Sequence, residues 1–230
     1  MDNEFSLSEE QPVFDWGWIA DNLADEILPA LLGHLILSFV SVAIALAISL
    51  PVGIAVTRKR GFYTPVTLFA GFLFTIPNLA FFSILISVPG IGVGKTPAII
   101  ALSAYSLLIL IRNVVTGINS VPAATKDAAR GMGLTERQIL LGVELPLALP
   151  VIVAGVRIAS VTVIGIAAIA AFIGGGGLGT LIFDGIDREF PTLTIVGAAL
   201  AAAVAITTDV SLNRLEQRLR PWARRAAGAV

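Results

Sequence analysis

The sequence of 230 residues contains no cysteine, a single histidine and few charged residues. Without cysteine the chain has no disulfide framework, no thiolate metal site and no cysteine nucleophile. One histidine also excludes a histidine-based metal cluster, so we expect no metal site. Charged residues make up 13% of the chain and hydrophobic residues 56%, with a mean hydropathy of +0.90, whereas soluble domains carry about 25% charged residues. This composition excludes an ordinary soluble enzyme.

The charges are confined to short islands, and long stretches without Asp, Glu, Lys or Arg lie between them. A bilayer core about 30 Å thick requires roughly 20 apolar residues of helix, and most of these stretches reach that length. The runs are continuously apolar rather than alternating, which favours helices over barrel strands. We therefore expect an all-α, polytopic membrane protein with about five transmembrane helices, at residues 28–56, 64–88, 96–118, 147–172 and 193–212.

The distribution of charge predicts how these helices are oriented. Basic residues follow the first, third and fifth spans, and the positive-inside rule makes those ends cytoplasmic. Residues 1–26 hold eight acidic side chains and no basic one, so we expect them outside the cell and the C-terminus inside. They lack the features of a cleaved signal peptide, so the first span should be retained. Residues 27–212 form the predicted transmembrane domain, and 213–230 a basic cytoplasmic tail, with a surface helix from about Leu212 to Arg225 on the inner leaflet.

One predicted cytoplasmic segment, residues 119–146, is neither apolar enough to span the membrane nor polar enough to be disordered. Good helix formers follow Pro122 and predict a helix over 123–130 with proline at its first turn. Thr135 is placed to cap a second short helix over 136–141, ahead of the fourth span. The pattern predicts a short helix that lies under the membrane.

The same segment carries a spaced motif. Asp127-Ala128-Ala129 is followed by three residues, Gly133, nine residues and then Val143-Glu144-Leu145-Pro146. This resembles, without a gap, the cytoplasmic signature of the integral membrane subunits of binding-protein-dependent ABC importers, which reads Glu-Ala-Ala, three residues, Gly, nine residues, Ile-x-Leu-Pro. Asp for Glu and Val for Ile are conservative departures.

The resemblance implies a type I ABC importer transmembrane fold and a coupling helix that docks in a cleft of a separate ATP-hydrolysing subunit. Asp127 can pair with a basic residue of that partner, and Gly133 permits a sharp turn. For Lys126 and Arg130, contact with the partner and contact with anionic lipid headgroups both stay open. The alternative is a surface helix that only connects two spans. The residues implied in coupling are Asp127, Ala128, Ala129, Arg130, Gly133, Leu145 and Pro146.

Further segments narrow the resemblance to permeases for osmoprotectants such as glycine betaine, carnitine and choline. The likeness covers roughly residues 30 to 212, and Asn78 stands where a serine is expected. The segments that carry it are residues 34–39, 51–55, 76–80, 90–102 and 173–179.

The sequence also bears on cofactors and partners. It contains no Gly-x-x-x-x-Gly-Lys-Ser/Thr loop, since the glycine spacing before Lys95-Thr96 is wrong, and no polar extension long enough for a binding protein. We therefore expect a translocation subunit that is not an enzyme and binds no cofactor directly, with ATP and Mg on a partner. The implied partners are an ATP-binding subunit, an extracytoplasmic substrate-binding protein, a second permease that is a copy or a paralogue, and the lipid bilayer of a bacterial or archaeal cell membrane. No nucleic acid is expected.

Three residues are candidates for the translocation path. Pro77 and Asn78 can break the second span and open backbone carbonyls to a cavity. Arg157 lies about 15 Å into the fourth span, so its side chain should face protein or a water-filled interior, as a gate or as a packing cation. His34 is expected to be a hydrogen-bonded packing residue rather than a pH sensor.

Other functions remain as alternatives. A permease for an amino acid or another small solute would share the loop. An ion-coupled secondary transporter would need acidic residues within its spans, where the marginal Asp209 is the candidate. A membrane scaffold would not require the motif spacing.

Overall fold

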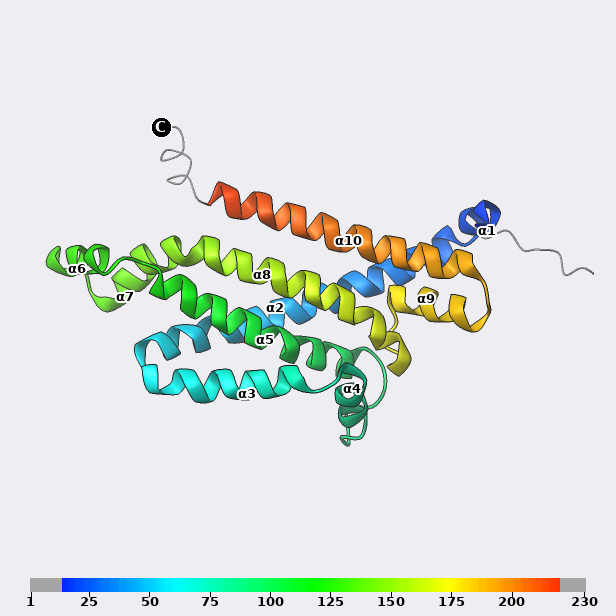
Figure 1. The fold of residues 1–230 in the computed structure, drawn as a ribbon, viewed down its shortest axis with the longest axis horizontal. Helices are drawn as coiled ribbons and strands as arrows, with labels where there is room; N and C mark the ends of the chain where they lie inside the picture. The colour runs from blue at the N-terminus through cyan, green and yellow to red at the C-terminus, as the bar shows by residue number, and fades with distance from the viewer. Residues whose placement is uncertain (1–13, 220–230) are drawn as a thin grey trace, which may run out of the picture.

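The computed structural model describes residues 14–219, and every regular element in that range is a helix (Figure 1). The four unbroken stretches that are long and apolar enough to cross a membrane are Leu23–Arg58, Lys95–Asn119, Glu136–Ile173 and Pro191–Arg218. A fifth possible span is the pair α3 (Tyr63–Thr75) and α4 (Asn78–Ile86), which is bent by 94° at its break. The predicted all-α membrane fold with about five spans is therefore confirmed.

The long helices lie alongside one another (Figure 1). The other α-helices, in chain order, are α1 (Trp16–Asp21), α2 (Leu28–Arg58), α5 (Lys95–Asn119), α6 (Ala123–Gly131), α7 (Glu136–Ile139), α8 (Leu145–Ala167), α9 (Leu178–Asp187) and α10 (Pro191–Arg218). Helices α6 and α7 lie at one end of the bundle, and α1 and α9 lie at the other, from which α10 runs back toward the α6 end (Figure 1).

Helix α5 packs against α2, α3 and α8 and forms the centre of the bundle. Small residues allow these backbones to approach closely, as helices do in lipid. A Cβ atom added to Gly53 of α2 would lie 2.5 Å from the Val114 Cγ1 atom of α5, and one added to Gly155 of α8 would lie 2.4 Å from the Asn113 Cβ atom. Between the helices, Leu102, Val163 and other apolar side chains are fully buried.

The break in the second span lies at Pro77, as the sequence predicts. Proline has no N–H and disfavours helical geometry at the residue before it, and Ile76 is extended at φ −67° and ψ 127°. The Tyr105 hydroxyl donates a hydrogen bond of 2.6 Å to the Ile76 carbonyl, and the Tyr105 ring makes edge contacts with Phe74 and Phe81. The carbonyl at the break is thus bonded to protein.

Two predicted boundaries are wrong. The fourth apolar helix does not begin at residue 147, because a π-helical turn, Leu140–Glu144, joins α7 to α8 without a gap. Helix α10 continues through residue 212 to Arg218, so residues 213–218 belong to the same helix as the last predicted span and no separate helix begins at Leu212. Residues 220–225 of that predicted helix, and residues 1–13 of the acidic 1–26 segment, lie outside the described residues.

A steric test follows from α9. A Cβ atom added to Gly179 would lie 1.9 Å from the Ala168 carbonyl oxygen, so the backbone must move. We expect Gly179→Ala to lower the free energy of unfolding by about 1–3 kcal/mol or more. Thermal unfolding of the detergent-purified protein measures this change. Gly165→Ala on α8 is the control, because no atom lies within 4 Å of its Cβ position. Equal melting temperatures for the two variants would contradict the assigned packing.

Candidate functional site

Helix α6 begins directly after Pro122, whose φ of −57° and ψ of 138° direct the chain into the first turn. At its other end the Leu134 N–H donates to the Ala129 carbonyl at 3.2 Å, and the Gly133 N–H donates to the Arg130 carbonyl at 2.9 Å. This pair of bonds is a Schellman motif, and Gly133 takes its left-handed position with φ +82°. The motif glycine is therefore the residue that ends α6 and reverses the chain.

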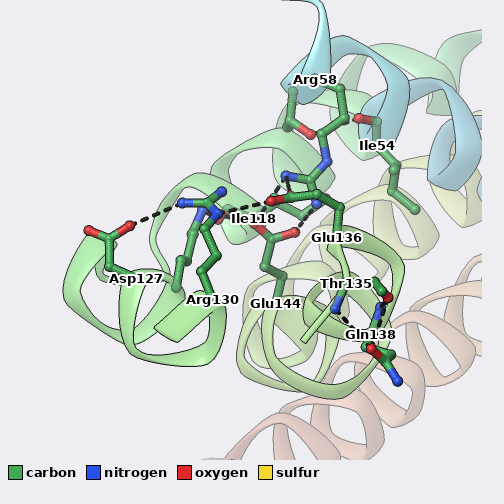
Figure 2. A network of polar contacts seen from close by, with 11 residues as sticks. Ile54, Arg58, Ile118, Asp127, Arg130, Thr135, Glu136, Gln138 and Glu144 are labelled. Atoms are coloured by element: carbon green, nitrogen blue, oxygen red, sulfur yellow. Dashed lines mark hydrogen bonds and ion pairs between the residues drawn. The ribbon is translucent and has the colours of Figure 1, made fainter. Parts of the chain in front are cut away.

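A capping box begins the next helix. The Thr135 hydroxyl accepts from the Gln138 N–H at 3.4 Å, and the Gln138 side-chain oxygen accepts from the Thr135 N–H at 2.8 Å (Figure 2). Both bonds satisfy backbone donors that a helix start leaves free. The predicted cap at Thr135 is confirmed, and with the Schellman motif it fixes the turn between α6 and α7.

Glu144 is the buried centre of the loop. Its side chain lies in the π-helical turn before α8 and is 0% exposed. Arg58, the last residue of α2, donates to both carboxylate oxygens, and the Lys126 ammonium lies 3.1 Å from Oε1 (Figure 2). Lys126 also donates to the Ile118 carbonyl at 3.3 Å. Lys126 is thus bonded within the chain, whereas the sequence left contact with a partner and contact with lipid headgroups open.

A second set of ion pairs lies on the surface of the loop. Arg130 bonds Asp127 at 3.0 Å and Glu136 at 2.9 Å, and Glu136 lies 3.9 Å from Arg58 (Figure 2). The hydrogen bond with Glu136 raises the pKa of the Arg130 guanidinium, so Arg130 stays charged. Charges of alternating sign therefore run from exposed Asp127 through Arg130, Glu136 and Arg58 to buried Glu144.

The remaining motif residues divide into buried and exposed positions. Ala129 is buried, whereas Ala128 and Pro146 are exposed. Leu145 packs against the cluster of Val114, Ile118, Ala148 and Ile152. The structure thus brings the motif residues together in one loop at one end of the bundle.

An apolar surface that sequence reasoning missed lies on the same loop. Met132 is 73% exposed and Leu141 is 54% exposed. A pocket of about 650 Å³ lies beside Leu134, Thr135, Arg137, Gln138, Leu141 and Gly142. The available signal in the sequence was that large apolar residues, Met132 and Leu141 among them, lie outside the predicted spans.

The candidate path residues do not form one site. Arg157 of α8 faces α10, where its guanidinium lies 3.7 Å from Asp209 and 4.0 Å from Glu216. The break at Pro77 and Asn78 instead lies against Tyr105 of α5. Arg157 therefore faces protein, as its predicted role as a packing cation requires. His34 is fully buried with its Nε2 atom 3.1 Å from the Ile164 carbonyl oxygen, which confirms its packing role.

A bundle of apolar helices that carries one small, ordered loop at one end defines a polytopic membrane protein. The chain belongs to the family of binding-protein-dependent transport system inner membrane components, whose model matches residues 45–221. It is therefore a membrane-embedded permease subunit of an ABC importer, and in this family ATP hydrolysis lies on a separate subunit.

Several characterised relatives are similar along most of their length. The osmoprotectant import permease protein OsmW of Salmonella typhimurium (strain LT2) is 42% identical over 82% of this chain and 89% of its own. The carnitine transport permease protein OpuCB of Listeria monocytogenes is 39% identical over 84% of this chain and 88% of its own. The choline transport system permease protein OpuBB of Bacillus subtilis (strain 168) is 39% identical over 85% and 89%, respectively.

Solved structures show the same fold. A chain of the MetNI methionine ABC transporter superposes with a TM-score of 0.74 at 24% identity, covering 84% of this chain and 95% of that chain. A chain of an amino acid ABC transporter superposes with a TM-score of 0.69 at 19% identity, covering 83% and 92%. These likenesses confirm the type I importer transmembrane fold.

The capping box gives a local prediction. Thr135→Ala removes one cap bond, so we expect the start of α7 to lose about 1 kcal/mol of stability, seen as faster amide hydrogen exchange over residues 136–139. Thr162→Ala on α8 is the matched control, because the Thr162 hydroxyl bonds the Ile158 carbonyl inside a helix and caps nothing. Unchanged exchange in Thr135→Ala would contradict the role of the cap.

Proposed function

We propose that the chain is the translocation subunit of an ATP-driven importer for osmoprotectant quaternary amines such as glycine betaine, carnitine or choline. The observation that carries this substrate class is the 42% identity, over 82% of the chain, to a permease named for osmoprotectants. Relatives named for carnitine and for choline support the same class. A quaternary ammonium is recognised mainly by cation–π contacts in an aromatic cage, which we place in a separate extracytoplasmic binding protein.

We orient the bundle with the α6 and α7 end in the cytoplasm. Lys59, Arg137 and Arg214 support this choice because they belong to the basic islands at that end. The opposite end holds α1 and α9 with acidic Asp25, Glu26 and others. In this orientation the N-terminal segment is outside and the basic C-terminal tail is inside.

Helix α6 is the proposed coupling helix that docks in a cleft of the ATPase. A rigid amphipathic helix in a groove can transmit displacement. Asp127 and Arg130 are exposed, so their ion pair can exchange for charges of the partner, and Met132 and Leu141 offer apolar contact. ATP and Mg would be held by that partner, while Ala128, Ala129, Gly133, Leu145 and Pro146 shape the loop.

A second permease subunit, a copy or a paralogue, would complete the path. We place Pro77 and Asn78 beside it, because broken helices line the substrate site in many transporters. For Arg157, the pairing with two acidic residues of α10 supports the packing role over the gate. That pairing also engages Asp209, the residue on which the secondary-transporter alternative depends.

The coupling role predicts the effect of two loop substitutions. Asp127→Lys reverses the charge offered to the ATPase, and Gly133→Asp adds a negative charge at the turn where φ is +82°. We expect both to leave membrane insertion intact and to lower uptake and ATPase co-purification about tenfold. Asp127→Glu and Gly133→Asn are the controls, because they keep the charge and the left-handed conformation. Normal uptake and co-purification in both loop variants would reject the coupling role.

The substrate class can be tested by uptake. Cells that express the complete importer should accumulate labelled glycine betaine, carnitine or choline, and an excess of any carried quaternary amine should compete. Methionine and histidine at the same excess are the controls, because a cation–π cage selects the quaternary ammonium. Uptake that only an amino acid inhibits would support the amino-acid alternative.

A further inference from the structure

The α6–α7 loop has a contact with α2 that the chain connectivity does not require. Along the chain the loop joins α5 to α8, whereas α2 ends at Arg58, which is 86 residues away from Glu144. The two side chains nevertheless form paired hydrogen bonds, and Lys126 of α6 holds the same carboxylate. Three segments of the chain therefore meet at one carboxylate (Figure 2).

We propose that Glu144 is a positioning residue that ties the coupling loop to α2, so that displacement of α6 moves α2 and α8 together. This inference rests on the coupling role proposed above. Without this joint between Glu144, Arg58 and Lys126, motion of α6 would reach α2 through packing with α5 and α8 and through the exposed Arg58–Glu136 ion pair. With it, the loop acts directly on the first long helix of the bundle.

The burial of Glu144 makes the joint persistent. Its side chain is 0% exposed, and the partners Arg58 and Lys126 are 36% and 19% exposed. Removing both partners would leave the buried carboxylate uncompensated, which is strongly unfavourable. The Asp127–Arg130 pair differs, because its side chains are 69% and 49% exposed and exchange with water or another charge at little cost. The surface pair can thus be remade on docking while the buried joint holds.

The backbone places Glu144 by a local irregularity. Residues Leu140–Glu144 form a π-helical turn, and the Leu145 N–H bonds the Leu140 carbonyl five residues before it. An extra residue in a turn changes which side chains face a neighbouring helix, and such turns are frequent at functional positions. Here the turn brings a carboxylate to the ends of α2 and α6.

The joint can be tested by distance measurements in the assembled importer. The chain has no cysteine, so Lys59→Cys beside α2 and Ala124→Cys on α6 accept spin labels without background. Both native residues are exposed. We expect the distance between the labels to be the same without nucleotide and with a non-hydrolysable ATP analogue. In Glu144→Gln, the distance should shift or broaden with the analogue. A distance that changes with nucleotide in the otherwise native chain would overturn the proposal.

A functional measurement separates positioning from stability. Apolar replacement of a buried ion pair often preserves stability, so Arg58→Met/Lys126→Met/Glu144→Met tests the joint in a chain that can still fold. We expect this variant and Glu144→Gln to co-purify with the ATPase but to transport about fivefold less glycine betaine per ATP hydrolysed. Glu144→Asp should recover part of that ratio.

Two outcomes would overturn the proposal. A native ratio of uptake to hydrolysis in the triple variant would show that the ion pairs serve stability alone. Loss of the ATPase from Glu144→Gln would show that Glu144 shapes the docking surface instead. The unsubstituted importer is assayed first, so a failure of the proposed function appears there, as absent glycine betaine uptake or absent ATPase.

Discussion

Water is missing from the bilayer core, so each backbone N–H and C=O group there must find its partner within the protein. The apolar stretches meet this requirement as helices. At the break before Pro77, the Tyr105 hydroxyl bonds the Ile76 carbonyl. Between α2 and α5, the Ser103 hydroxyl bonds the Ser41 carbonyl at 3.1 Å. The same constraint therefore accounts for the regular helices and for the hydrogen bond found at the break.

Two charged side chains of the α8 stretch are paired with charges on other helices. Glu144 and Arg157 both lie within the apolar stretch Glu136–Ile173, and each pairs with the opposite charge on another helix. Glu144 joins the start of α8 to α2, and Arg157 joins the middle of α8 to α10. Apolar packing is non-directional, so it does not by itself fix how these helices are aligned. The two ion-paired contacts supply fixed points on α8 against its neighbours.

The sequence predicted the features that depend on neighbouring residues. Long apolar runs gave the spans, and Pro122 and Thr135 gave the starts of α6 and α7. The contacts of Glu144 could not be predicted in the same way, because they join residues 58, 126 and 144 across three elements, and because the motif leaves the position of Glu144 unspecified. A carboxylate among apolar residues, at the end of the bundle where the basic islands gather, was the available signal. The partner of the carbonyl at the 94° bend could not be predicted either, because Tyr105 lies on another helix, 29 residues along the chain from Ile76.

A loop that transmits displacement must be stiff within and adaptable at its surface. The Schellman motif at Gly133 and the capping box at Thr135 satisfy the backbone groups of the turn. Buried Glu144 ties the loop to α2 through Arg58. The surface contacts of Asp127 and Arg130 are exposed ion pairs, which contribute little net stability in water and so can be exchanged. In the proposed function, a partner replaces these outer contacts without disturbing the inner ones. This division between exchangeable outer ion pairs and a lasting inner one explains why one short segment holds buried and exposed charges side by side.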